Sequence, residues 1–287
     1  MLNSFSKPSA LIKHIMSVLN ETDRIKRVNL KGVTSVSYAS TVLFLIGPRC
    51  QANKFTAEPC LILNKRSMKV KQPGDLCCPG GSLSTRLDSY LAKLLHLPGS
   101  PLKRWPYWSL WRERHPNRAA KLAMIFAASL RESFEEMRLN PLGAELLGLL
   151  PSQQLVMFRR VIYPLVCWIP RQRRFKPNWE VAKIVYIPLR NLMEPKNYAR
   201  YRLHIDDGTQ KNGQNPGVRE FPCFVHQEPD STENLWGATF RITMAFLDIV
   251  FKFTPPDIET LPVVKGTLGH NYLTGEGYGG CQRNVPK

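Results

Sequence analysis

The stretch "ASLRESFEEMRL", residues 128–139, places three glutamates among apolar side chains in a chain that is otherwise strongly basic. Glu132, Glu135 and Glu136 follow one another at helical spacing, which puts them on one side of a helix. Three carboxylates this close repel one another unless a cation lies among them, and hard oxygen ligands suit Mg²⁺ or Mn²⁺. A solvated acidic helix face has the same pattern, so both interpretations stand.

The segments around this stretch predict an α/β fold. A helix is expected from Asn117 to about Met137, and a second one over 233–253. The polar stretch 196–232 is expected to be a long loop, and strands mixed with few helices predict a sheet with helices on both faces. The apolar side chains of the first helix that should face the core are Ala123, Ala127, Leu130, Phe134 and Met137. The expected strands lie at 36–47, 59–66, 145–150, 160–169 and 180–189.

The composition limits the class of protein. The 287 residues are 43% hydrophobic, which is enough for one large domain with appendages. No apolar run reaches the roughly 18–20 residues of a transmembrane helix. The formal net charge of +18 favours a polyanionic partner, whether nucleotide, nucleic acid or acidic membrane. Seven cysteines without a CxxC pair argue against a disulfide framework or a zinc site, and a cytoplasmic location is expected.

Two segments together resemble a known family. "RESFEEMRL" (131–139) resembles the second half of the Nudix box, G-x5-E-x7-R-E-U-x-E-E-x-G-U, in which U is apolar. Upstream, "LILNKRSMKVKQPGDLCCPGG" (61–81) resembles the signature of the Nudix subgroup that includes coenzyme A pyrophosphatases. Segments similar to later parts of that subgroup follow in order, and the resemblance spans about 36–253. The residues that fit the upstream signature are Arg66, Ser67, Gly74, Pro79, Gly80 and Gly81.

The resemblance implies a Nudix-type α/β/α sandwich with a mixed β-sheet. It also implies metal-dependent hydrolysis of a pyrophosphate bond in a nucleoside diphosphate linked to another moiety, with coenzyme A or a related compound favoured. The alternative is a catalytically weakened Nudix-fold module that binds nucleotide, nucleic acid or an anionic membrane surface. The expected domains are a helical extension (1–35), the Nudix domain (36–253, with an insertion at about 88–117) and a tail (254–287). The sequence assigns no role to the tail and no oligomeric state.

The resemblance also assigns roles to individual residues. Mg²⁺ or Mn²⁺ would be held by the three glutamates with Gly81, and Arg131 would orient the glutamates or form a purely structural ion pair. Substrate phosphate would meet Gly80, Gly81, Lys65 and Arg66, although the two cations would equally suit a strand-end surface. Glu180 is a candidate general base or a structural residue. Trp236 and Thr239 would line the nucleotide pocket or pack in the core. The catalytic set is Arg131, Glu132, Glu135 and Glu136.

Three departures from the Nudix pattern stand out. Leu87 occupies the position of its first glutamate, with Asp88 as the neighbouring acid, and Arg138 replaces its second glycine. Gly81 and Arg131 are 50 positions apart where the pattern has 14, so an insertion separates them. The insertion carries tryptophans at helical spacing, namely Trp105, Trp108 and Trp111. A lid over a base, an interfacial membrane segment and an ordinary packed helix are the three alternatives for it.

Overall fold

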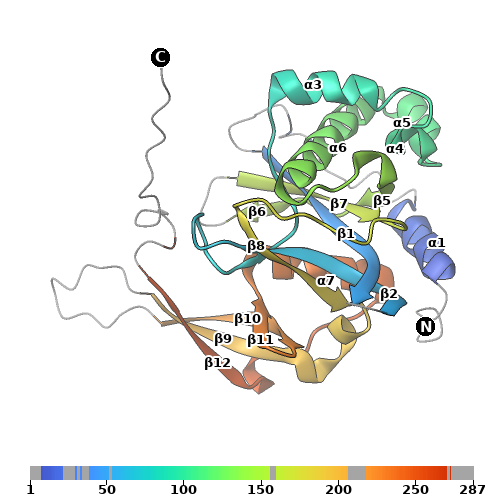
Figure 1. Ribbon diagram of the computed structural model, residues 1–287. Coiled ribbons are helices and arrows are strands. Elements are labelled where there is room, and N and C mark those ends of the chain that lie inside the picture. The colour runs from blue at the N-terminus through green and yellow to red at the C-terminus, as the bar shows by residue number, and fades with distance from the viewer. Residues whose placement is uncertain are drawn as a thin grey trace, which may run out of the picture.

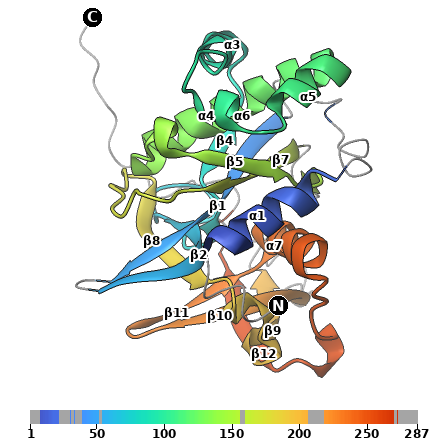
Figure 2. The same ribbon diagram turned by 90° about the vertical axis from the view of Figure 1, so that its right-hand side faces the viewer.

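The computed structural model describes residues 8–21, 30, 33, 39–51, 54–155, 160–205, 218–269 and 272. An eight-stranded sheet lies at its centre, with α6 on one face and α1 and α7 on the other (Figure 1). A four-stranded sheet lies beside α7, as Figure 2 also shows. The described chain therefore confirms the α/β class with helices on both faces of a mixed sheet.

The central sheet and the helices that cover it come from most of the chain. The strands of the central sheet are β1 (Ala39–Gln51), β2 (Lys54–Arg66), β3 (Leu76–Cys77), β4 (Gly80–Ser82), β5 (Glu145–Leu149), β6 (Gln153–Leu155), β7 (Arg160–Trp168) and β8 (Val181–Pro188). The second sheet contains β9 (Tyr198–Ile205), β10 (Val218–Glu228), β11 (Ser231–Leu235) and β12 (Val263–Leu268). The helices are α1 (Pro8–Leu19), α3 (Thr85–Leu94), α4 (Pro101–Arg104), α5 (Trp108–Arg114), α6 (Pro116–Met137) and α7 (Gly237–Phe251), with 3₁₀ turns at Pro141–Gly143, Asn191–Met193, Pro195–Asn197 and Ile258–Thr260.

Strand β1 organises the central sheet and separates two cores. It pairs in parallel with β7 and antiparallel with β2 and β4, which makes the sheet mixed. Because successive strand side chains point to opposite faces, its buried residues alternate between the two helical layers. Leu43 and Leu45 join the core that contains α6, whereas Phe44 and Ile46 join the core that contains α1 and α7.

Most of the expected elements are confirmed, with three corrections. Residues 196–232 are not one long loop, because they contain β9 and β10 and the start of β11. The second helix begins at Gly237 rather than at 233, since the residues before it form β11. Phe134 does not face the core: its side chain is 43% exposed and lies under the Arg138 guanidinium.

Segments near both ends of the described chain pack against the rest of the structure. Helix α1 buries Leu11 and Ile15 completely, and the Asn20 side chain donates a hydrogen bond to the Leu147 carbonyl at 2.7 Å. Strand β12, from the expected tail, pairs in parallel with β9. No helix in the described part of the chain is both long enough and apolar enough to cross a membrane.

The insertion forms α3, α4 and α5, which lie beside α6 (Figure 1). Trp105, Trp108 and Trp111 are at most 2% exposed, and they belong to the same core cluster as Leu122 of α6. Their indole rings therefore do not reach a ligand or a membrane. Of the three alternatives for the insertion, the structure supports ordinary packing for the tryptophans.

This packing predicts a large loss of stability when one of these rings is removed. Trp108→Ala should lower the free energy of unfolding by about 3–5 kcal/mol, because a buried tryptophan leaves both lost contacts and a cavity. Trp179→Ala is the matched control, since that ring is 58% exposed, and it should cost less than about 0.5 kcal/mol. Urea denaturation followed by circular dichroism measures both. Equal small effects would show that the insertion is not part of the core.

Candidate functional site

Helix α6 carries the acidic stretch and ends where the family pattern has a glycine. Arg138 has φ 56° and ψ 40°, the left-handed conformation that glycine usually supplies at a helix end. Its backbone N–H donates to the Phe134 carbonyl at 3.0 Å, and the Leu139 N–H donates to the Ser133 carbonyl at 3.3 Å. The arginine therefore keeps the helix end that the pattern requires, at a conformational cost of roughly 1 kcal/mol.

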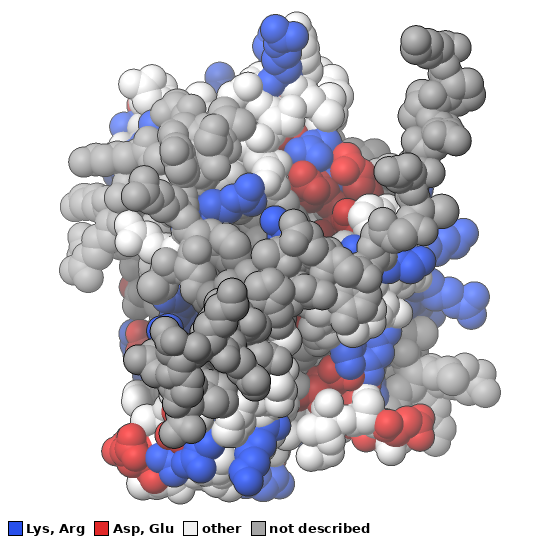
Figure 3. Space-filling model, turned by 90° about the vertical axis from the view of Figure 1, so that its left-hand side faces the viewer, with Lys and Arg blue, Asp and Glu red and all other residues white. Residues whose placement is uncertain are grey.

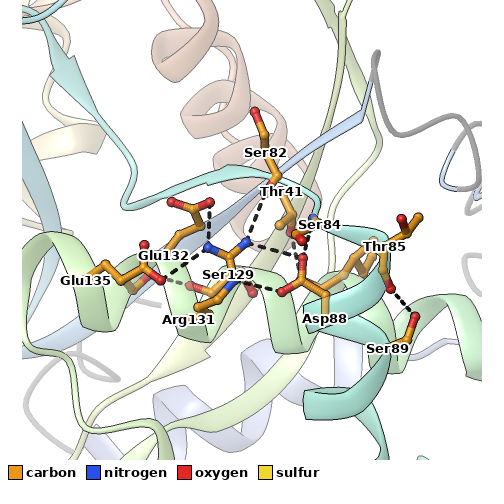
Figure 4. Close-up of polar contacts among 12 residues, drawn as sticks. Thr41, Ser82, Ser84, Thr85, Asp88, Ser89, Ser129, Arg131, Glu132 and Glu135 are labelled. Atoms are coloured by element: carbon orange, nitrogen blue, oxygen red, sulfur yellow. Dashed lines mark hydrogen bonds and ion pairs between the residues drawn. The ribbon is translucent and has the colours of Figure 1, made fainter. Parts of the chain in front are cut away.

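The Arg131 guanidinium lies at the centre of an ion-pair network (Figure 4). Its Nε donates to Asp88 Oδ1 at 2.8 Å, and its Nη1 donates to Glu132 Oε1 at 3.0 Å and to Glu135 Oε1 at 3.3 Å. Its Nη2 also donates to the Ser82 carbonyl at 3.2 Å. The hydrogen bond to Asp88 is the largest of the influences that raise the pKa of Arg131. The guanidinium therefore holds α3, β4 and two of the three glutamates in fixed relative positions.

Asp88, rather than Leu87, faces this network. The Asp88 side chain is fully buried, and its Oδ2 accepts a hydrogen bond from the Ser84 N–H at 2.6 Å. Leu87 is 47% exposed, so it does not lie where a ligand carboxylate is needed. The acid next to the expected position has therefore taken a structural role beside Arg131. Leu87→Glu would add a surface charge and should leave activity unchanged.

Glu136 is the most enclosed of the three glutamates. Its Oε2 accepts hydrogen bonds from Asn64 Nδ2 at 2.9 Å and from the Gly80 N–H at 3.1 Å. Burial, with the neighbouring charges of Glu132 and Glu180, raises the pKa of Glu136 to about 8. Burial also raises the pKa of Glu132. Both carboxylates would be stabilised by an additional positive charge at this place.

Two glycines allow the helix and the sheet to meet here. A Cβ on Gly81 would lie 2.5 Å from Glu132 Cδ, so only glycine lets that carboxylate rest on the strand. Gly80 has φ 144°, and a Cβ there would lie 2.3 Å from the Thr41 carbonyl oxygen. The two glycines thus bring the β4 backbone and the acidic side chains of α6 close together; their contact with metal and phosphate stays a prediction.

The oxygen donors of this site suit a divalent cation, but the three glutamate side chains do not converge on one point. Glu132 and Glu136 supply hard oxygen ligands, and both have raised pKa values that a cation would offset. Glu135 does not join them, because its side chain is 52% exposed and lies on Arg131. Within the described residues, no group of three His, Cys, Asp or Glu side chains is arranged as a ligand set.

Two cavities lie next to this part of the molecule: Glu136 lines the smaller one, and Gly80 and Gly81 line the larger one. The smaller one, about 70 Å³, is lined by Asn64, Arg66, Glu136 and Glu180 among others. The larger one, about 440 Å³, extends from Gly80 and Gly81 along α7. Arg66 and Cys77 line both, so the Arg66 side chain connects the acidic end of the site with the larger cavity. Glu180 is thus close to Glu136, where a general base or a structural acid would lie.

Lys65 lies apart from the other predicted site residues. Asn64 and Arg66 line the smaller cavity, and Lys65 between them points to the opposite side of β2. Its ammonium contacts Glu233 at 3.0 Å, and Lys183 contacts the same carboxylate at 2.7 Å. Burial opposes ionisation of Glu233, but the hydrogen bonds from Lys183 and Lys65 lower its pKa. This ion pair joins the two sheets and does not line either cavity.

The larger cavity is also lined by two residues that the sequence did not single out, Asp75 and Tyr272. Trp236 and Thr239, both named as candidates, line it together with Asp75 and Tyr272. The Asp75 carboxylate accepts hydrogen bonds from Trp236 Nε1 at 3.1 Å and from the Tyr272 hydroxyl. Asp75 and Tyr272 are 197 positions apart, so neither spacing nor periodicity could have connected them.

Comparisons with known proteins place Nudix structures among those similar to this chain. No protein-family model and no curated protein matches it. A Nudix hydrolase, RenU, from M. smegmatis is 12% identical over 54% of this chain and 73% of its own, with a TM-score of 0.30. A C. elegans Ap4A hydrolase binary complex is 11% identical over 54% of this chain and 83% of its own, with a TM-score of 0.32. A Nudix hydrolase from Alicyclobacillus acidocaldarius is 15% identical over 54% of this chain and 81% of its own, with a TM-score of 0.33.

The buried ion pair predicts that Asp88 is needed for stability. Asp88→Asn should lower the free energy of unfolding by about 2–3 kcal/mol, because it removes one partner of a buried pair while Arg131 keeps its bonds to the glutamates. Leu87→Asn is the adjacent control on the exposed side of α3 and should cost less than about 0.5 kcal/mol. Chemical denaturation of both variants checks this, and similar costs would mean that the pair is solvated.

The raised pKa of Glu136 predicts a pH dependence of stability in the absence of metal. Between the unfolded pKa near 4.5 and the folded pKa of about 8, the folded state binds more protons, so stability falls as pH rises. Glu136→Gln removes this contribution. The difference in free energy of unfolding between variant and parent should therefore grow in favour of the variant from pH 5 to pH 8. We expect a change of more than about 1.4 kcal/mol, which corresponds to a shift of one pKa unit.

Denaturation in a chelator across that pH range measures this difference. Glu113→Gln is the control, because Glu113 is an exposed residue of α5. If Glu136→Gln and Glu113→Gln change stability in parallel at every pH, then Glu136 titrates normally and is not enclosed as described.

Proposed function

We propose that this protein hydrolyses the pyrophosphate bond of a nucleoside diphosphate linked to another moiety, with coenzyme A or a related compound as the favoured substrate. The observation that carries the proposal is the meeting of Glu132 and Glu136 with the Gly80–Gly81 backbone at one end of a cavity of about 440 Å³. That volume lies within the range of small-molecule sites. The preference for coenzyme A comes from the resemblance of residues 61–81 to the pyrophosphatase signature.

Mg²⁺ or Mn²⁺ would be held by Glu132 and Glu136, with Glu135 and the Gly81 backbone as further ligands. When bound, the ion supplies charge neutralisation of the phosphates and polarisation of an attacking water. Arg131 holds the Glu132 and Glu135 carboxylates by hydrogen bonds of 3.0 and 3.3 Å before any ligand arrives. Such preorganised charges contribute to catalysis because they need no rearrangement during the reaction.

The remaining residues position the substrate. Arg66 lines both cavities, and a guanidinium suits bidentate contact with phosphate oxygens. Burial raises the pKa of the Cys77 thiol to about 12, so it stays protonated and does not compete as a nucleophile. Asn64 fixes the orientation of the Glu136 carboxylate through its 2.9 Å hydrogen bond. Water is therefore the nucleophile in the proposed reaction.

The surface charge is compatible with an anionic substrate. On the face in Figure 3, acidic side chains form separate groups, and Lys and Arg are distributed around them. With a net charge of +18, the molecule attracts polyanions over a distance of about one Debye length, roughly 8 Å at physiological salt. The ligand phosphates would then meet carboxylates, which is favourable only when cations are also present.

The proposal predicts selective loss of turnover in glutamate variants. Glu132→Gln, Glu135→Gln and Glu136→Gln should each lower kcat by at least about 100-fold with coenzyme A as substrate, because each removes a charge that acts in the transition state. Excess chelator should abolish turnover, and added Mg²⁺ or Mn²⁺ should restore it. Mass spectrometry of the products, with ADP-ribose, dinucleoside polyphosphates and NADH tested in parallel, identifies the substrate.

Glu113→Gln carries the same chemical change on an exposed helix and should keep full activity. Parent-like turnover in all three glutamate variants would show that these carboxylates are not ligands. Binding of nucleotides without any turnover by the parent would favour the alternative of a catalytically weakened binding module.

A further inference from the structure

The larger cavity is lined by aromatic rings as well as by the Gly80–Gly81 backbone. Phe221, Trp236, Phe240 and Tyr272 all line it. The Trp236 and Tyr272 rings are inclined by 29°, with centroids 6.3 Å apart, and Phe221 contacts Trp236 at 5.6 Å between centroids. Trp236 and Tyr272 both line the cavity, and Trp236, which is partly buried, is more exposed than Tyr272 at 7%. An aromatic wall of this kind stacks planar ligands.

Asp75 holds this wall in place. It lies in the turn between β2 and β3, and its two carboxylate oxygens accept from the Trp236 indole and the Tyr272 hydroxyl, one each. The same turn also binds the backbone of the C-terminal segment, because the Gln72 N–H donates to the Tyr272 carbonyl at 2.9 Å. Burial raises the pKa of Asp75 to about 6, so the carboxylate is ionised at neutral pH and accepts from both donors.

We propose that the wall formed by Trp236 and Tyr272, positioned by Asp75, binds the nucleobase of the substrate while its phosphates lie at Gly80, Gly81 and Arg66. This assignment rests on the proposed function and specifies which half of the substrate enters the larger cavity. Tyr272 is a specificity-determining residue in this scheme, and Asp75 is a positioning residue that acts through the two rings.

The composition of the lining favours a base over the flexible moiety attached to the other phosphate. A base offers a flat surface to the rings and polar edges to side-chain amides, and Gln72 brings an amide into the lining. Arg66, Arg160 and Arg241 also line the cavity, which suits a ligand that carries phosphate. Both halves of the substrate carry phosphate for the arginines, but a flexible chain without a planar ring would not use the flat aromatic surfaces.

The test compares ligands with and without a base. Isothermal titration of the full-length protein would measure Kd for AMP, for pyrophosphate and for 4′-phosphopantetheine in the parent and in Tyr272→Ala. Loss of a stacking ring should raise the Kd for AMP by about tenfold or more, since base stacking is worth roughly 1–3 kcal/mol. The Kd values for the two base-free ligands should change by less than about twofold.

Three further variants separate binding from folding. Tyr272→Leu keeps an apolar side chain and serves if Tyr272→Ala is unfolded by circular dichroism. Asp75→Asn should raise KM for the hydrolysed substrate with kcat unchanged, because one amide oxygen cannot replace two carboxylate oxygens as acceptors. Tyr90→Ala is the matched control on α3, where that ring is 66% exposed, and it should alter none of these constants.

The outcomes are distinct. An unchanged Kd for AMP in the folded Tyr272 variants would overturn the base assignment, and so would a loss confined to 4′-phosphopantetheine, which would place the other half of the substrate in the cavity. Hydrolysis by the parent alongside either result would leave the proposed function intact. Conversely, Tyr272-dependent binding of AMP in a parent that hydrolyses nothing would overturn the proposed function and support the base site.

Discussion

The ion-pair network around Arg131 is the interaction on which the acidic site depends. A single guanidinium contacts Asp88 from α3, the Ser82 carbonyl from β4 and two glutamates from α6. Without it, the carboxylates on the helix would repel one another, and α3 would lose its buried polar anchor. Because Asp88 is fully buried, the pair is protected from solvent and fixes the geometry more strongly than a surface ion pair would.

The parts of the fold that were predictable from the sequence are those whose pattern reflects burial. Strands β1, β2, β7 and β8 have the apolar runs of a sheet covered on both faces, and α6 has an apolar stripe. Strands β9 and β10 were missed because they lie in the second sheet, where half of β10 is exposed and carries polar side chains. Phe134 was misassigned because helical periodicity does not reveal that Arg138 covers its ring.

The site divides in the same way. Glu132, Glu136 and the two glycines could be named as candidates because they follow motifs with fixed local spacing. Asn64, Asp75, Asp88 and Tyr272 were not assigned their roles, since each acts through a partner far away in the sequence, 43 to 197 positions distant. For Lys65 the motif was misleading. Its position in the motif suggested phosphate binding, but side chains alternate between the two faces of β2, and Lys65 lies on the face that meets Glu233. Local spacing cannot determine which face of a strand meets which partner.

Substrate choice is therefore better sought in the segments outside the motif than within it. The helix α3, at the start of the insertion, supplies Asp88 at the acidic end of the site, and the C-terminal segment supplies Tyr272 to the lining of the larger cavity. In the proposed function, the motif residues between them would set which bond is broken, because they would hold the charges that act on phosphate. The residues that line the cavity would decide which molecules bind, because the loss of an aromatic stacking partner weakens the binding of a base by a few kcal/mol at most. Under the proposed function, a change at Tyr272 alters which ligand binds and leaves the proposed chemistry of the glutamates in place.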